Sequence, residues 1–247
     1  MLNVPRVVTA LLAVLVTVHV VGALVPDAKA WLLLWFSFIP ARYDVAEVTW
    51  GGPAGLGPQI WTFVSYALLH GSLLHVGVNA VWFLAFGSAV ARRFGTARFL
   101  IFFAVTAAAG AALHLATHLE EMVPMVGASA AISGYMAAAS RFAFQDGGPL
   151  GLWRAHESHA YHVPAAPLRL ALTQTNVLAF LLVWFGLNIM LGFFGSLSIG
   201  GEDQEIAWQA HIGGFLAGLL LFPWFDPVRP ADGLDAGAGL DAAGKEG

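Results

Sequence analysis

Long stretches of the chain carry no charged side chain and consist almost entirely of apolar residues. A helix needs roughly 20 such residues to cross a hydrocarbon core of ~30 Å. Six stretches approach this length, at about 7–25, 66–87, 99–117, 126–141, 175–195 and 206–224. The stretch at 126–141 is short, but its alanines and glycines are typical of a tightly packed inner helix. The pattern predicts an all-α membrane protein with a bundle of six transmembrane helices.

The first predicted connection, at about 27–62, is long and contains a shorter apolar run at 31–41. This run is rich in Trp and Phe and is too short to cross a membrane, so we expect an interfacial or re-entrant helix. A cleavable signal peptide is an alternative for the N-terminus, because Arg6 precedes an apolar stretch and Ala28-Lys29-Ala30 imitates a cleavage site. That stretch has about 19 residues, more than the usual 7–15 or so, and we favour a membrane span.

Basic residues between the predicted spans gather on one side of the membrane. That side holds Arg6, Arg92, Arg93, Arg98, Arg141, Arg154, Arg169 and Arg229, whereas the opposite loops hold only Lys29 and Arg42. The positive-inside rule predicts that both termini are cytoplasmic, which requires an even number of spans. We expect residues 1–225 to form one membrane domain. Residues 226–247 are poor in apolar side chains other than Ala, and we expect a disordered cytoplasmic tail.

Composition narrows the class of protein further. Apolar residues make up 58% of the chain and charged residues only 11%, against roughly 25% charged residues in a soluble domain. The net charge of −4 argues against binding to nucleic acid, which requires a basic face. The absence of cysteine excludes disulfides, thiolate metal sites and a cysteine nucleophile. Sparse loops and a compact six-span form suit a multi-pass protein of a bacterial plasma (inner) membrane.

Strongly polar residues inside membrane spans are costly, and they are candidates for function. His70, His75 and Asn79 lie in the second span, Ser129 begins the fourth, and His211 lies near the start of the sixth. These three spans run in the same direction. At a rise of 1.5 Å per residue, all five side chains fall within ~5–15 Å of the outer surface. A hydroxyl, imidazoles and an amide from three helices therefore share one depth.

This combination fits nucleophilic catalysis. A serine hydroxyl is a weak nucleophile until a base, most often histidine, takes its proton. No carboxylate lies within these spans, so we expect a Ser–His pair rather than a full triad. Asn79, a histidine and the Ser129 backbone N–H near a helix N-terminus could donate hydrogen bonds to an oxyanion. Taken alone, Ser129 reads as a packing residue of a small-residue helix, and His211 as a proton relay or a satisfied core residue.

Three motifs together resemble the rhomboid family of intramembrane serine proteases. They are His70-x4-His75-x3-Asn79 in the second span, Gly127-Ala128-Ser129 with Gly134 in the fourth, and Ala210-His211-x2-Gly214-x3-Gly218 in the sixth. The resemblance covers about residues 50–225 and includes Trp61, which resembles part of a Trp-Arg element of the family's first loop.

The resemblance implies a six-helix bundle with a water-filled cavity open to the outside. It implies that Ser129 is the nucleophile, that His211 is the general base, and that His75, Asn79 and the Ser129 N–H form the oxyanion hole. His70 would be structural, and Gly127, Gly214 and Gly218 would support the site. Substrates would be single-span membrane proteins within the lipid bilayer, cut in or near the transmembrane segment, and no cofactor is expected. The sequence indicates neither the substrate nor an oligomeric state.

The chain departs from the family pattern at three positions. Ala130 follows the serine where many members have glycine, and Thr62 replaces a common first-loop arginine. Ser133 stands where some members place an aromatic residue against the base, so we expect looser support of His211. The glycines Gly195, Gly200 and Gly201 in the loop at 196–207 and its border suggest that this loop, with the fifth span, gates access.

Three other classes of function compete with proteolysis. The first is a non-proteolytic scaffold or chaperone of the same fold, disfavoured by the retention of Ser129 and His211. The second is a metal or haem protein, suggested by the i, i+4 pair His114 and His118. Without carboxylates in the spans we expect no metal there, and weak binding at most by the loop trio His156, His159 and His162. The third is a transporter, which predicts related halves with broken helices, and the sequence has no such symmetry.

Overall fold

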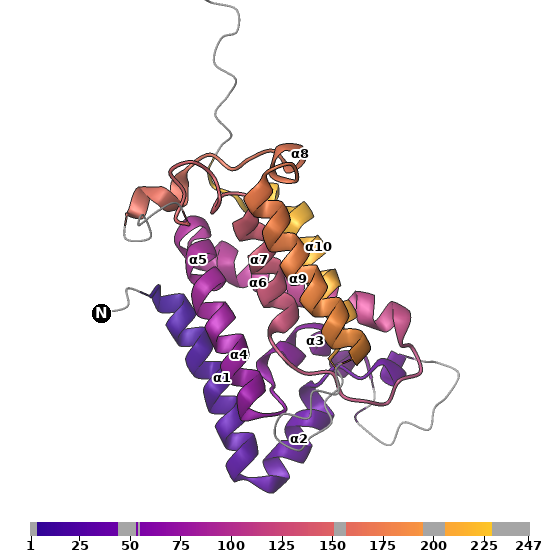
Figure 1. The fold of residues 1–247 in the computed structure, drawn as a ribbon. Coiled ribbons are helices and arrows are strands. Elements are labelled where there is room, and N and C mark those ends of the chain that lie inside the picture. The colour runs from indigo at the N-terminus through magenta and orange to yellow at the C-terminus, as the bar shows by residue number, and fades with distance from the viewer. Residues whose placement is uncertain (1–3, 44–52, 54, 151–156, 195–205, 229–247) are drawn as a thin grey trace, which may run out of the picture.

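The computed structural model describes residues 4–43, 53, 55–150, 157–194 and 206–228 (Figure 1). The long elements are α1 (Arg6–Leu24), α2 (Pro26–Phe36), α3 (Leu56–Ser65), α4 (Leu73–Trp82), α5 (Ser88–Phe94), α6 (Thr96–Thr117), α7 (Ser129–Ser140), α9 (Thr175–Phe194) and α10 (Trp208–Phe225). Shorter elements are η1 (Pro40–Tyr43), η2 (Tyr66–Leu68), the π-helical η3 (Phe83–Gly87), η5 (Ser158–His162) and α8 (Leu168–Ala171). Within these ranges, extended pairing is limited to one antiparallel bridge between Phe38 and Met125.

The fold is an all-helical membrane bundle. Three helical stretches in the described ranges are long and apolar enough to cross a membrane, namely Arg6–Leu24, Leu73–Phe94 and Thr96–Thr117, and Thr175–Met190 is a shorter apolar helix. Helices α7 and α10 occupy the two remaining stretches that the sequence predicts as spans. Six crossings and cytoplasmic termini stay predictions.

The second predicted span begins later and ends later than expected. Residues 66–68 form η2 and Leu69 is extended, so α4 begins only at Leu73, where the Ser72 hydroxyl accepts a hydrogen bond from the His75 N–H. The helix then continues through η3 into α5 and ends at Phe94. Apolar character alone does not separate a helix from the tight turn that precedes it. The described parts of the first loop are likewise largely helical. Helix α2 begins at Pro26 and ends at Phe36, so it starts and ends earlier than the apolar run at 31–41.

The centre of the bundle is the contact among α6, α7 and α10, and small residues make it close. A Cβ on Gly214 would overlap the Ala130 carbonyl oxygen, and one on Gly218 would overlap the Gly134 carbonyl oxygen. A Cβ on Gly110 would lie 2.6 Å from the Ala130 Cβ. Backbone-to-backbone approach of this kind is how helices associate in lipid, where the hydrophobic effect does not drive them together. Around this centre, α1 lies beside α4, and α9 runs along α10 (Figure 1).

A buried ion pair closes the bundle at the end of α10. The guanidinium of Arg93, at the end of α5, donates from Nε and Nη2 to the two carboxylate oxygens of Asp226, each at 2.8 Å. Its Nη1 donates to the carbonyls of Tyr161 at 2.8 Å and Val163 at 2.9 Å. The Arg93 side chain is fully buried, and its guanidinium also lies over the rings of Phe142 and Phe222, with Cζ 4.5 Å and 5.6 Å from their centroids.

We expect Asp226→Ala to destabilise the fold, because it leaves the Arg93 charge buried without its carboxylate. Removal of one partner of a buried pair costs about 3–5 kcal/mol. The thermal unfolding midpoint in detergent should fall clearly, while Arg98→Ala, at an exposed position near the start of α6, should leave it nearly unchanged. Equal midpoints for the two variants would show that the pair does not hold the fold.

Candidate active site

Ser129 and His211 lie in hydrogen-bond contact although 82 residues separate them in the chain. Ser129 is the first residue of α7, and His211 lies in the first turn of α10. The Ser129 Oγ and His211 Nε2 are 2.7 Å apart. This is the distance required for a base that takes the hydroxyl proton.

A third side chain, Asn188 of α9, lies behind the imidazole. Its Oδ1 is 2.7 Å from His211 Nδ1, and its Nδ2 donates to the Trp184 carbonyl at 2.8 Å. The Trp184 contact fixes the orientation of the amide, because only the nitrogen can donate to a carbonyl. The Asn188 oxygen therefore accepts the Nδ1–H, and Nε2 is left with the lone pair that faces Ser129.

The turn before Ser129 is held by backbone and imidazole contacts. Gly127 has φ +123°, a backbone conformation that residues other than glycine rarely adopt. Its N–H donates to the Tyr66 carbonyl at 3.0 Å, and the next N–H, of Ala128, points at His70 Nε2 at 3.5 Å. These contacts deliver Ser129 at the start of α7.

His75 covers the same turn from α4. A Cβ on Gly127 would lie 2.7 Å from His75 Nε2 and 3.6 Å from Ser129 Oγ, so the imidazole and the hydroxyl flank the same point. The rings of His70 and His75 meet edge to face with centroids 5.0 Å apart. One turn further along α4, Asn79 is buried, and its Nδ2 has no hydrogen-bond partner in the ranges described. A buried donor without a partner is available to a ligand oxygen.

The structure therefore brings most of the predicted site residues into one region. Ser129 pairs with His211, His75 lies over Gly127, His70 holds the turn, and Gly214 and Gly218 set the approach of α10 to α7. Sequence reasoning missed Asn188, because the search of the spans for a partner of histidine considered carboxylates only. The signal was present as an amide inside an apolar stretch, the criterion that selected Asn79.

The three residues that depart from the family pattern each make contacts close to their own position. The Ser133 hydroxyl donates to the Ser129 carbonyl at 2.8 Å, and Ala130 packs against Gly214 and Gly110. Thr62 is buried, donates to the Pro58 carbonyl at 2.6 Å and lies 2.8 Å from the Tyr43 hydroxyl.

The described parts of the first loop are therefore anchored without the family's arginine. The indole of Trp61 adds a bond to the Trp35 carbonyl at 2.9 Å. Most of the loop at 196–207, and His156 of the histidine trio, lie outside the described residues.

Comparison with known proteins agrees with this geometry. The family model of the rhomboid domain matches residues 57–225. The rhomboid protease GlpG of Yersinia pseudotuberculosis serotype I (strain IP32953) is 27% identical over 169 residues, which cover 67% of this chain and 48% of the relative. GlpG of Yersinia pestis (strain Pestoides F) is 28% identical with the same coverage. The chain thus spans about half the length of these curated relatives. Because the family model covers well over half of the chain and includes both Ser129 and His211, the chain belongs to the rhomboid family.

Proposed function

We propose that the chain is an intramembrane serine endopeptidase that cleaves single-span membrane proteins in or near their transmembrane segment. The observation that carries the proposal is the 2.7 Å contact between Ser129 Oγ and His211 Nε2 at the point where α7 and α10 meet. Membership of the rhomboid family and the protease names of the curated relatives support it.

The proposed reaction proceeds through an acyl-enzyme. Ser129 Oγ attacks the scissile carbonyl carbon while His211 Nε2 takes the hydroxyl proton. The carbonyl oxygen becomes an oxyanion that accepts hydrogen bonds from His75, Asn79 and the Ser129 N–H. The C–N bond then breaks, and His211 gives its proton to the leaving amine. Water, deprotonated by His211, hydrolyses the ester and restores Ser129.

Asn188 acts as a positioning residue in this scheme. Its oxygen accepts the His211 Nδ1–H and so selects the tautomer in which Nε2 is the base. The same bond stabilises the imidazolium after proton transfer. The third position of a catalytic triad serves these two purposes, and here an uncharged amide takes that position.

The proposal includes the topology predicted from the sequence. Six crossings with cytoplasmic termini place the start of α7 and α10 near the outer surface, where water reaches the site. A bacterial inner membrane is the expected location, and the curated relatives are bacterial. Asp226, the first residue of the predicted tail, forms the ion pair with Arg93.

We expect Ser129→Ala and His211→Ala each to abolish turnover. The measurements are labelling by a fluorophosphonate probe and cleavage of a fluorogenic single-span reporter in liposomes. Ser158→Ala, in an exposed part of the chain, serves as a serine control and should label and cleave like wild type. A folded wild type that neither labels nor cuts any of several reporters would favour the non-proteolytic scaffold instead.

We expect Asn188→Ala to lower kcat with little change in KM, because it removes a hydrogen bond to the charged imidazolium without touching substrate. Such a bond contributes about 1.5–3 kcal/mol, which corresponds to a loss of roughly 10–150-fold. Asn188→Asp retains an acceptor oxygen and should recover much of the activity. Asn176→Ala, an exposed asparagine in the first turn of the same helix, is the matched control. A change in KM with unchanged kcat, or equal kcat for both alanine variants, would contradict the role assigned to Asn188.

We expect Gly127→Ala to inactivate the enzyme, because its methyl group would collide with His75 and displace the turn that carries Ser129. Gly95→Ala is the matched control, since Gly95 also has positive φ (+74°) but open space where a Cβ would lie. Both variants should lose stability through backbone strain, about 1–3 kcal/mol, and only the first should lose cleavage. Equal cleavage rates at matched folded fractions would contradict this expectation.

A further inference from the structure

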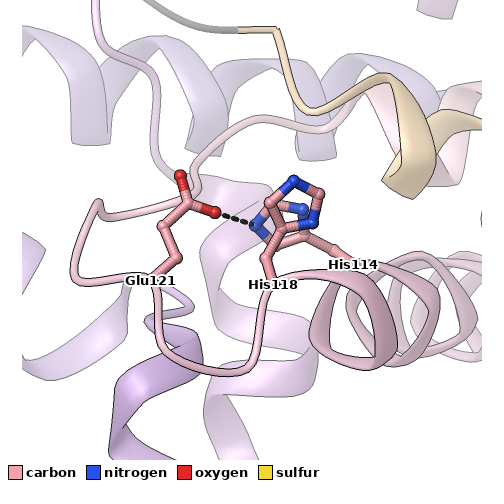
Figure 2. A group of neighbouring side chains, drawn as sticks. All are labelled: His114, His118 and Glu121. Atoms are coloured by element: carbon pink, nitrogen blue, oxygen red, sulfur yellow. Dashed lines mark ion pairs between the residues drawn. The ribbon is translucent and has the colours of Figure 1, made fainter.

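A group of potential metal ligands lies outside the Ser129–His211 site, at the C-terminal end of α6. His114 lies in the last turn of α6, His118 is its C-cap residue, and Glu121 follows in the turn beyond it (Figure 2). One nitrogen of each imidazole and one carboxylate oxygen all lie within 4.8 Å of one another. We propose that His114, His118 and Glu121 bind one Zn²⁺ ion.

The ligand types select the metal. Two imidazoles and a carboxylate form a known zinc set that leaves a fourth position for water, whereas Ca²⁺ and Mg²⁺ prefer oxygen ligands alone. His114 Nε2 is already 3.5 Å from Glu121 Oε2. Ligand atoms about 2.0–2.1 Å from zinc in a tetrahedral site lie roughly 3.3 Å apart. A bound ion would draw the ligand atoms, which now lie within 4.8 Å of one another, closer together.

The tautomer of His118 is already the one that a metal requires. Its Nδ1 lies 2.7 Å from the Thr117 hydroxyl oxygen. That hydroxyl lies 3.1 Å and 3.0 Å from the carbonyls of Leu113 and His114 and donates to them. Thr117 therefore accepts the Nδ1–H and leaves the lone pair on Nε2. Orientation of a ligating imidazole through its other nitrogen is the usual arrangement around protein-bound metals.

Burial and stacking favour the site over a solvated ion pair. His114 is buried, and the Glu121 side chain is only 22% exposed. The rings of His114 and His118 stack with centroids 4.6 Å apart, and Figure 2 shows both beside the Glu121 carboxylate. His118 Nε2 is 3.3 Å from the side-chain nitrogen of Gln209 in α10, a contact that zinc would replace. Without a metal, one carboxylate lies beside two imidazoles. A bound metal would contact all three groups at once.

The expected role of the ion is to fix the connection between α6 and α7. The Glu121 carbonyl accepts a hydrogen bond from the Ala41 N–H at 3.0 Å, and Met125 pairs with Phe38 in both directions. Ser129 follows four residues after Met125. A zinc ion on Glu121 would therefore pin the segment that leads into α7. The sequence predicted no metal at His114 and His118, because no carboxylate lies inside the spans. Glu121 lies just beyond the third predicted span.

The test measures zinc binding by untagged, metal-free protein in detergent, with wild type, His118→Ala and isosteric Glu121→Gln. Isothermal titration gives stoichiometry and Kd, thermal unfolding gives the effect on stability, and Co²⁺ substitution gives a tetrahedral absorption spectrum. The control variant His159→Ala/His162→Ala removes two loop histidines, of which the His159 side chain is 69% exposed. None of these readouts depends on proteolysis.

We expect wild type and the loop variant to bind one Zn²⁺ per chain, with a raised unfolding midpoint and a tetrahedral Co²⁺ spectrum. His118→Ala and Glu121→Gln should each weaken binding at least tenfold, since loss of even an outer partner of a metal site costs about 10–100-fold. No binding by wild type at micromolar Zn²⁺ would overturn the proposal. So would binding that survives in His118→Ala and Glu121→Gln, or that disappears in the loop variant.

Discussion

The backbone contact between α7 and α10 is the constraint on which the rest of the site depends. Gly214 packs against the Ala130 carbonyl and Gly218 packs against the Gly134 carbonyl. The two contacts are one helical turn apart on both helices. Ser129 is the neighbour of Ala130, and His211 lies three residues before Gly214. A side chain at either glycine would push the helices apart, and the 2.7 Å contact between Oγ and Nε2 would open with them. Small residues in lipid thus perform the task that buried apolar side chains perform in water.

The same environment explains why an amide stands behind the histidine. Asn188 is buried, so a carboxylate in its place would be a poorly solvated charge, and it would be costly before any substrate arrived. Asn188 gives the imidazole an acceptor without a charge, and its second hydrogen bond, to the Trp184 carbonyl, holds that acceptor in place. In return, an amide stabilises the imidazolium less than a carboxylate does. Ser133 offers His211 no aromatic support, and Asn188 supplies an alternative from a different helix.

Hydropathy predicted where most of the helices lie, because it is a local property of the sequence. The depth of Ser129 and His211 in the membrane stays a prediction. The start of α4 at Leu73 was missed because a count of charge-free residues runs through Gly71 and Ser72, although Ser72 is the N-cap of the helix. Arg93 was interpreted as a loop charge that sets topology, yet its side chain is fully buried in an ion pair with Asp226. This pairing was not predicted, because the two residues are 133 positions apart in the chain. Asn188 was missed for a similar reason, because its partner His211 lies 23 residues away on another helix. Each acquires meaning only from a partner that the fold brings to it.

Helix α10 meets its neighbours backbone to backbone, whereas α9 meets α10 through side chains. Close to the centre of the bundle α10 meets α6 and α7 backbone to backbone, and at its end Asp226 is held by Arg93. The side chains of α9 that reach α10 include Trp184, stacked on Phe215 with centroids 4.3 Å apart, and Asn188 on His211. The base therefore lies on a helix packed by backbone contact, and the hydrogen bond to its Nδ1 comes from a helix packed by side chains. A displacement of α9 that breaks the Asn188 bond frees His211 to change tautomer while leaving Ser129 and the packing of α7 on α10 in place.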